Sequence, residues 1–381
     1  MFEETSQQFN AWKIVSRTLM IFGINNLKSE KYQDKNYIFE KFFKGIRALW
    51  SIVIFSYLLM FACCGITESK ICLVHVADMS LVNILWLAVC WKFQPIAKYM
   101  KETFSFLKSY QENHYQFKIK FLIFFTLIWV NVVYNEIRLI AVPGMLNRLK
   151  NIVSLGLYQS DQSDWPSSAE WLFSVGILAG CFFHHVFPSL ATMIGCLVLH
   201  RNYCLISCWQ DKIQGFFEEL RDRTFRTEFQ KTIDHVKRAN LLISPLLFIL
   251  ISYWLTAIFY NSTKLMYTAI FEDITSYLSV VFNTTSYSMQ FVILLALASK
   301  IPMAVCEIKR TVLRTSNARD YVFIDSARSG DISLFISMLD SFKEEVTVAP
   351  FEILTLKKGI ILVSLGVVVT YELLLLQILE K

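Results

Sequence analysis

Long stretches without charged side chains are the feature of this sequence that most restricts its fold. Trp171–His200 runs for 30 residues without Asp, Glu, Lys or Arg, and Ile274–Ser299 runs for 26. A helix needs about 20 apolar residues to cross the hydrocarbon core of a bilayer. Seven segments meet or approach that length: Ala48–Thr67, Ile71–Trp91, Phe121–Val142, Trp171–His200, Ala239–Thr263, Ile274–Ser299 and Gly359–Leu379.

These segments predict an all-α membrane protein with seven transmembrane helices. A backbone in lipid must satisfy its own hydrogen bonds, which leaves only helices and closed barrels. Barrel strands would be alternating segments of about ten residues, whereas these runs are continuously apolar. The composition agrees, because 18% of the residues are charged against about a quarter in a typical soluble domain.

Lysine and arginine are distributed unevenly along the chain. With the N-terminus placed in the cytoplasm, 31 of the 37 lie in cytoplasmic segments or at the cytoplasmic ends of the spans. Positive residues favour the cytoplasmic side, so the sequence predicts a cytoplasmic N-terminus and an extracellular C-terminus. This bias accounts for the net charge of +6 without a nucleic-acid partner. Asn261, in a glycosylation sequon on the predicted extracellular side, is a candidate acceptor.

Apolar runs and charged loops divide the chain into four predicted regions. Residues 1–44 form a cytoplasmic N-terminal segment with an amphipathic helix. Residues 45–299 hold the first six transmembrane helices and their intracellular loops. A cytoplasmic helical anchor region follows at 300–348, and 349–381 contains the terminal transmembrane helix.

Helical patterns also occur outside the spans. The charged segment 201–238 continues the fourth span, so that helix is predicted to extend beyond the bilayer. It can form a cytoplasmic bundle with the amphipathic segment Asp331–Phe342. The amphipathic segment Phe9–Ile24 fits either a helix at the inner membrane surface or one packed against other helices.

No pattern in the sequence indicates catalysis. The chain has no glycine-rich phosphate loop, no His-Glu-x-x-His and no Gly-x-Ser-x-Gly motif. Cysteine and histidine do not combine in a zinc spacing, and adjacent helical residues such as His184 and His185 point about 100° apart. We therefore expect no enzyme activity, no cofactor and no metal.

A short motif lies in the last apolar run. Thr370-Tyr371 is followed, after five residues, by a glutamine, and a glycine lies five residues before the tyrosine. This arrangement resembles the terminal helix of the insect gustatory receptors, whose opening segment is also similar to Phe9–Ile24. Two positions depart from the family pattern, because Ile378 replaces the usual Phe and Glu372 replaces an apolar residue. The motif residues are Gly366, Thr370, Tyr371 and Gln377.

The resemblance implies a tastant-gated, non-selective cation channel in the plasma membrane of sensory neurons. Subunits of this family assemble as homo- or hetero-tetramers with other gustatory receptor subunits. Four copies of the last helix would line one pore, and each subunit would bind a small molecule in the outer half of its helix bundle.

The residues of the last helix are compatible with a pore. At 100° per residue, one face carries Thr370, Leu373, Leu374 and Gln377 within about 60° of its centre. Leucines flanked by neutral polar groups suit a narrow pore that gates by dewetting. The alternative is ordinary helix packing, with Gln377 hydrogen-bonded to a neighbouring helix.

A ligand pocket needs polar and aromatic side chains that converge in the outer half of the spans. For each candidate, packing within the bundle or anchoring at the membrane interface is the alternative. The candidates are Asp78, Trp129, Tyr134, Asn135, Arg138, Ser174, His184, His185, Trp254, Tyr287 and Gln290.

Two other receptor classes compete with a gustatory receptor. An insect odorant receptor subunit of a heteromeric channel has the same topology but a different terminal signature. A G-protein-coupled receptor needs an extracellular N-terminus and a cytoplasmic tail, which the charge distribution disfavours.

Overall fold

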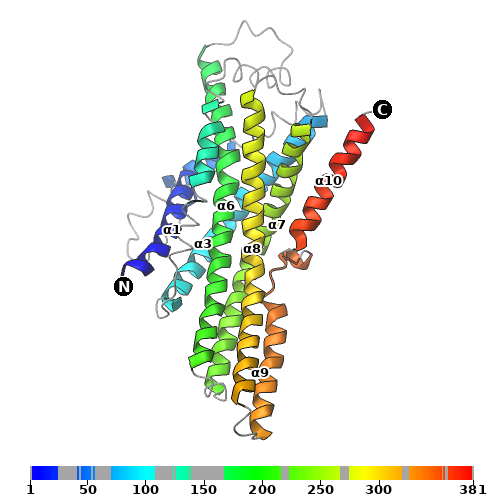
Figure 1. Ribbon diagram of the computed structural model, residues 1–381. Coiled ribbons are helices and arrows are strands. Elements are labelled where there is room, and N and C mark those ends of the chain that lie inside the picture. Colours follow the sequence, from blue (N-terminus) through cyan, green and yellow to red (C-terminus); the bar gives the residue numbers. More distant parts are fainter. Residues whose placement is uncertain are drawn as a thin grey trace.

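In the computed structural model, all regular structure among the described residues is helical (Figure 1). The helices are α1 (Phe2–Ile21), α3 (Lys70–Leu107), α6 (Ser167–Gly215), α7 (Arg223–Met266), α8 (Ile274–Arg319), α9 (Ser326–Glu345) and α10 (Gly359–Leu379), with the 3₁₀ turn η4 (Pro350–Glu352). The structure describes residues 2–24, 41–42, 44–52, 55, 70–107, 123, 126–135, 137–138, 167–215, 223–266, 274–319, 326–353, 355–356 and 359–379.

Four described helices are long and apolar enough to cross a membrane. Their spans are Met79–Thr103, Leu178–Gln210, Thr224–Leu265 and Ile274–Thr315, which confirms four of the predicted spans. The predicted terminal span coincides with α10. Of the other two, Ala48–Thr67 lies mostly outside the described residues, and Phe121–Val142 is described as helix in part.

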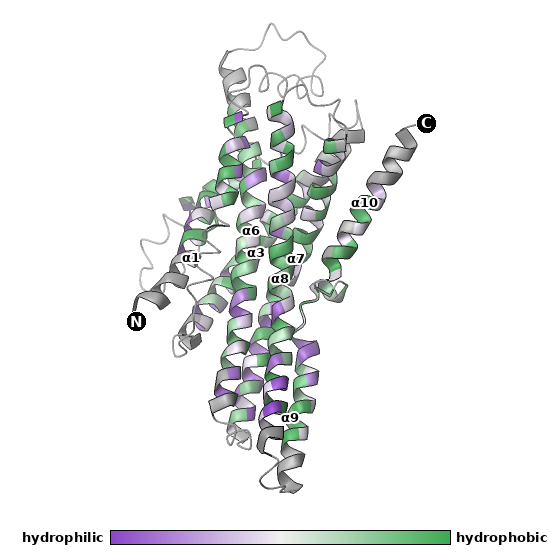
Figure 2. Cartoon of the chain, in the orientation of Figure 1, coloured by the Kyte–Doolittle hydropathy of each residue, from purple (hydrophilic) through white to green (hydrophobic). Residues whose placement is uncertain are grey.

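The long helices α6, α7 and α8 stand side by side and pack against one another, and α3 packs against α6 and α7 (Figure 1). The 49 residues of α6 extend over about 70 Å, more than twice the thickness of a bilayer core. The predicted extension of the fourth span is therefore confirmed. Figure 2 shows apolar residues along the middle of these helices and hydrophilic residues gathered at the end where α9 packs.

Aromatic side chains form the core at that hydrophilic end. Phe229 of α7 is fully buried, with ring centroids 5.2 Å from Trp209 of α6 and 5.7 Å from both Phe335 and Phe342 of α9. Phe225 adds a further contact to Trp209 at 5.1 Å. The predicted bundle of 201–238 with Asp331–Phe342 is thus present, and we name these five residues the lower aromatic cluster.

Helix α1 packs on the side of the bundle. Val15, Leu19 and Phe22 are fully buried, and the Phe22 ring lies 5.5 Å from both Phe183 and Phe187 of α6. The structure therefore favours the packed reading of Phe9–Ile24 over a helix lying only on the membrane surface.

A left-handed glycine terminates α1. Gly23 has φ +76°, its amide donates to the Met20 carbonyl at 2.9 Å, and the Ile24 amide donates to Leu19 at 3.1 Å. This hydrogen-bond pattern is a Schellman cap, which favours glycine. A Cβ at Gly23 would also lie 2.8 Å from the backbone nitrogen of Arg47, so no larger residue fits without a shift.

Candidate functional site

Among the predicted ligand residues, ring contacts connect His184 of α6, Trp254 of α7 and Tyr287 of α8. Tyr253 of α7 packs edge-on against Trp254 at 4.6 Å and against His184 of α6 at 5.9 Å. The Trp254 ring lies 5.1 Å from Tyr287 of α8. All four rings are buried, so they form an apolar centre between α6, α7 and α8. We name His184, Tyr253, Trp254 and Tyr287 the aromatic junction.

Hydrogen bonds fix the junction to its helices. The Trp254 indole Nε1 donates to Thr192 Oγ1 at 3.1 Å, and the Thr192 hydroxyl donates to the Pro188 carbonyl at 2.9 Å. This is the bond that a helical threonine commonly makes to the carbonyl four residues earlier. Thr192 is fully buried, so the indole orientation is set within the bundle.

Gln290, the fourth candidate, lies one turn beyond Tyr287 on α8 and is 1% exposed. Its Nε2 donates to Ser286 Oγ at 3.3 Å, but no donor among the described residues satisfies its Oε1. An unsatisfied buried oxygen costs about 1–3 kcal/mol. A bound molecule that donates a hydrogen bond to Oε1 would recover that cost.

Replacing Gln290 with methionine tests this role. Methionine has nearly the same shape, so the ligand-free protein should keep or gain stability because no oxygen is left unsatisfied. Loss of the acceptor should raise the half-maximal concentration of a hydrogen-bond-donating ligand about tenfold. Thermal unfolding and dose–response curves measure the two effects, with Thr285→Val at an exposed position of α8 as the control. An unchanged response would exclude Gln290 from ligand contact.

Asn135 belongs to an amide network rather than to the aromatic junction. Its Nδ2 donates to Asn283 Oδ1 of α8 at 2.9 Å, and its Oδ1 accepts from Ser279 at 2.6 Å. Asn131 also donates to Asn283 Oδ1, at 3.1 Å. This network joins the helical residues 126–135 to α8. Such interhelical hydrogen bonds between amides stabilise helix contacts in lipid, so the structure supports the packing alternative for Asn135.

Two neighbouring candidates make similar contacts. The Tyr134 hydroxyl donates to the Thr275 carbonyl at 3.4 Å, and the Arg138 guanidinium donates to Ser276 Oγ. Both partners lie in the first turn of α8, so these side chains continue the amide network toward that end of the helix. Trp129 is partly buried and packs against the core.

The two adjacent histidines make different contacts. The His185 ring nitrogen Nδ1 lies 2.8 Å from the Cys181 carbonyl, whereas His184 faces Tyr253. Their rings are 5.5 Å apart and nearly perpendicular. Among the described residues, no group of three or more His, Cys, Asp and Glu side chains is arranged to hold a metal ion.

The remaining candidates are Asn261, Asp78 and Ser174. Asn261 is 7% exposed and its Nδ2 donates to the Ala257 carbonyl at 2.7 Å, which argues against glycosylation there because the acceptor nitrogen must be accessible. The side chains of Asp78 and Ser174 lie outside the described residues.

The terminal helix α10 stands away from the bundle (Figure 1). Its described side chains are largely exposed, including Leu362 at 73% and Tyr371 at 57%. The Thr370 hydroxyl donates to the Gly366 carbonyl at 2.7 Å, and the Tyr371 ring contacts Phe259 of α7 at 6.1 Å. The side chains of Leu373, Leu374 and Gln377 lie outside the described residues.

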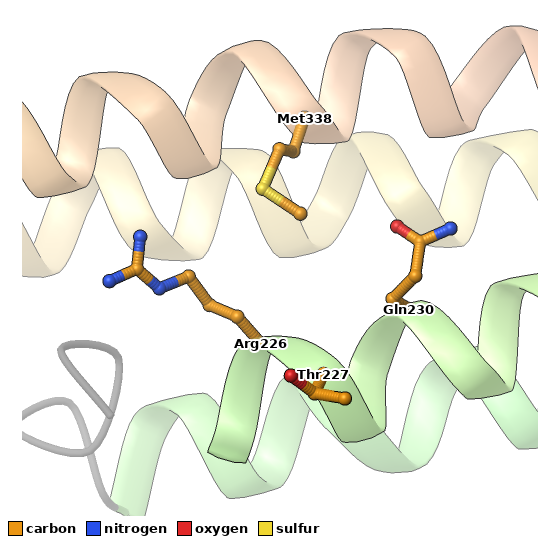
Figure 3. A pocket seen from close by; sticks show the side chains of 4 residues that line it. All are labelled: Arg226, Thr227, Gln230 and Met338. Carbon is orange, nitrogen blue, oxygen red and sulfur yellow. The ribbon is translucent and has the colours of Figure 1, made fainter. Parts of the chain in front are cut away.

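An open pocket of about 450 Å³ occurs at the other end of α7 (Figure 3). Arg226, Thr227 and Gln230 of α7 line it together with Met338 of α9. Arg226 lies 28 residues from Trp254 on the same helix, or about 40 Å away. This pocket is therefore separate from the aromatic junction.

Long helices with apolar middle sections define the chain as an all-α, multi-pass membrane protein. Its fold is that of the insect olfactory receptor OR5 from Machilis hrabei, which matches with a TM-score of 0.65 and 13% identity over 97% of this chain and 99% of OR5. The structure of OR5 in complex with eugenol matches with a TM-score of 0.63, at the same identity and coverage. Neither protein-family models nor curated proteins yield a match to the sequence. The fold implied by the resemblance to insect chemosensory receptors is thus confirmed.

Proposed function

We propose that this chain is a subunit of a tetrameric insect gustatory receptor that acts as a tastant-gated, non-selective cation channel in the plasma membrane of sensory neurons. The single observation that carries the proposal is the motif of α10, in which five residues separate Thr370-Tyr371 from Gln377. The likeness of the whole chain to an insect olfactory receptor supports the same broad class.

The exposure of α10 supports assembly through this helix. Leu362, Val363 and Val367 are 73%, 66% and 50% exposed, although the helix is apolar over nearly its whole length. An apolar helix in a membrane protein packs against lipid or against other helices, and polar groups on one of its faces are satisfied by neighbouring helices or by water. Four copies of α10 around an axis would provide both, with Thr370 and Gln377 facing the pore.

The aromatic junction is the proposed ligand site. Four buried rings and one buried amide oxygen suit a small, largely apolar molecule with a hydrogen-bond donor. OR5 was solved with eugenol, an aromatic molecule that carries a hydroxyl group, which agrees with ligands of this kind on this fold. A ligand would bind by shifting the rings of the junction, since they now contact one another.

Patch recording from cells that express this chain alone tests the proposal. We expect cation currents on application of aromatic tastants, carried by sodium and potassium alike, as the resemblance to gustatory receptors implies; a ring of neutral side chains is compatible with such weak selectivity. The Leu373→Trp variant serves as the negative control. Surface expression without current across a broad ligand panel would contradict a homomeric gustatory channel.

An odorant receptor subunit is the second candidate, and the likeness to OR5 favours it. Current that appears only on co-expression with a second channel subunit would support this assignment. Tags at the two ends separate both candidates from a G-protein-coupled receptor. In unpermeabilised cells, the C-terminal tag should be stained and the N-terminal tag should not.

A further inference from the structure

One face of α7 holds the segment that leads from α9 to α10. Asn240, Ser244 and Phe248 follow one another at intervals of four residues, so they lie on one side of the helix. Asn240 Nδ2 donates to the Val346 carbonyl at 2.9 Å. Ser244 Oγ accepts a hydrogen bond from the Phe351 amide at 2.9 Å, and Phe248 packs edge-on against the Phe351 ring at 5.4 Å.

The described residues of this segment, 346–353 and 355–356, are held by such contacts. We name them the linker. Phe351 has φ 51° and ψ 21°, a left-handed conformation that a residue with a side chain of this size rarely adopts. The Leu356 amide donates back to the Val348 carbonyl at 2.8 Å, and both side chains are buried. The linker residues are thus held in one conformation against α7, three residues before α10 begins at Gly359.

Buried polar groups extend this contact across the bundle. The Asn240 Oδ1 accepts from Asn202 Nδ2 of α6 at 2.8 Å, and Asn202 Oδ1 accepts from the Tyr99 hydroxyl of α3. Tyr99, Asn202 and Asn240 are 6%, 0% and 7% exposed. Hydrogen bonds among groups so deeply buried are costly to break, because each broken one leaves polar atoms unsatisfied. The linker carbonyl is therefore tied to three helices rather than to α7 alone.

The same helix also carries the aromatic junction. Tyr253 and Trp254 follow Ser244 by nine and ten residues, or about 15 Å along α7. Beyond them, Phe259 contacts Tyr371 of α10. A shift or rotation of α7 at the junction therefore acts on both the linker and α10.

We propose that Asn240 and Ser244 are positioning residues that couple movement of α7 to the pore helix through the linker. The proposal rests on the function proposed above, since it assigns α10 to the pore. Asn240 and Ser244 belong neither to the aromatic junction nor to α10. Their hydrogen bonds make the linker follow α7, so a change at the aromatic junction moves the inner end of α10.

The Ser244→Ala variant of the full-length protein tests the coupling. It removes the acceptor of the Phe351 amide and leaves the helix intact, since alanine is a good helix former. We expect hydrogen exchange of the Phe351 amide to become about tenfold faster and the half-maximal ligand concentration to rise about fivefold. Ser244→Thr keeps the hydroxyl and should restore both values. Ser252→Ala is the matched control, because Ser252 Oγ donates only to the Phe248 carbonyl of its own helix, at 3.0 Å.

Each possible result supports or overturns the proposed coupling of α7 to α10. Faster exchange with a shifted dose–response curve, both restored by threonine, supports the coupling. Faster exchange with an unchanged curve, or unchanged exchange, overturns it. A failure of the proposed channel function can be told apart from a failure of the coupling. Hydrogen exchange is measured on the purified protein and needs no current. A wild-type protein that conducts no current contradicts the proposed channel, independently of the exchange rate of the Phe351 amide.

Discussion

Leu373→Trp should abolish ligand-evoked current while leaving the amount of protein at the cell surface unchanged. The proposed pore face of α10 carries Leu373 between Thr370 and Gln377. Four indoles at the narrowest part of a pore would fill it and hold it dry. Whole-cell recording with surface labelling in the same cells measures both quantities, and we expect the current to fall at least about a hundredfold because the tryptophans block the constriction even with ligand bound.

The control for this variant lies on the same helix. Leu375 is the same residue type two positions further on, and it points about 200° around the helix from Leu373. Leu375→Trp should therefore retain most of the current. Gln377→Ala, on the pore face, should change the relative permeability of cations without blocking them. If both tryptophan variants behave alike, or if Gln377→Ala leaves permeability unchanged, α10 does not line the pore as proposed.

Phe229→Ala should cause the largest loss of stability among simple substitutions in the lower aromatic cluster. The Phe229 ring is fully buried and contacts Trp209, Phe335 and Phe342, so its removal leaves a cavity where three helices meet. Deletion of a buried phenylalanine ring costs about 3–5 kcal/mol. Thermal unfolding of the detergent-solubilised protein, monitored by size-exclusion chromatography, should show a markedly lower midpoint temperature than that of the wild type.

Leu334→Ala provides the comparison for Phe229→Ala, because Leu334 is a 54% exposed residue of α9 beside Phe335. Its midpoint should stay close to that of the wild type. Equal losses in the two variants would mean that the cluster does not hold α9 to the bundle in solution.

The structure distinguishes candidates that look equivalent in the sequence. Asn135 and Trp254 are both polar or aromatic residues within apolar runs, and nothing in the pattern separates them. Asn135 bonds to Asn283, 148 residues away, whereas Trp254 packs between α6 and α8. A residue's partners across the bundle depend on helix rotation, which the local sequence does not contain.

The buried asparagines behind the linker, Asn202 and Asn240, were not among the candidates for the same reason. Asn202 lies in a charged segment and Asn240 at the edge of a span, so both look like solvent-facing or boundary positions. The signal that could have identified them is a lone asparagine on the apolar side of a helix otherwise charged on its exposed face. Only in the folded chain do Tyr99, Asn202 and Asn240 meet.

The sequence by itself determined that this is an all-helical membrane protein, because a bilayer accepts only long apolar segments with satisfied backbones. It also placed the terminal helix at Gly359–Leu379, the bounds of α10. Only the tertiary structure decided that α1 packs on the bundle, that the aromatic junction forms, and that α7 holds the linker. The physical reason is that membrane insertion depends on the summed hydrophobicity of a local segment, whereas side-chain contacts depend on the relative rotation and depth of helices distant in the sequence.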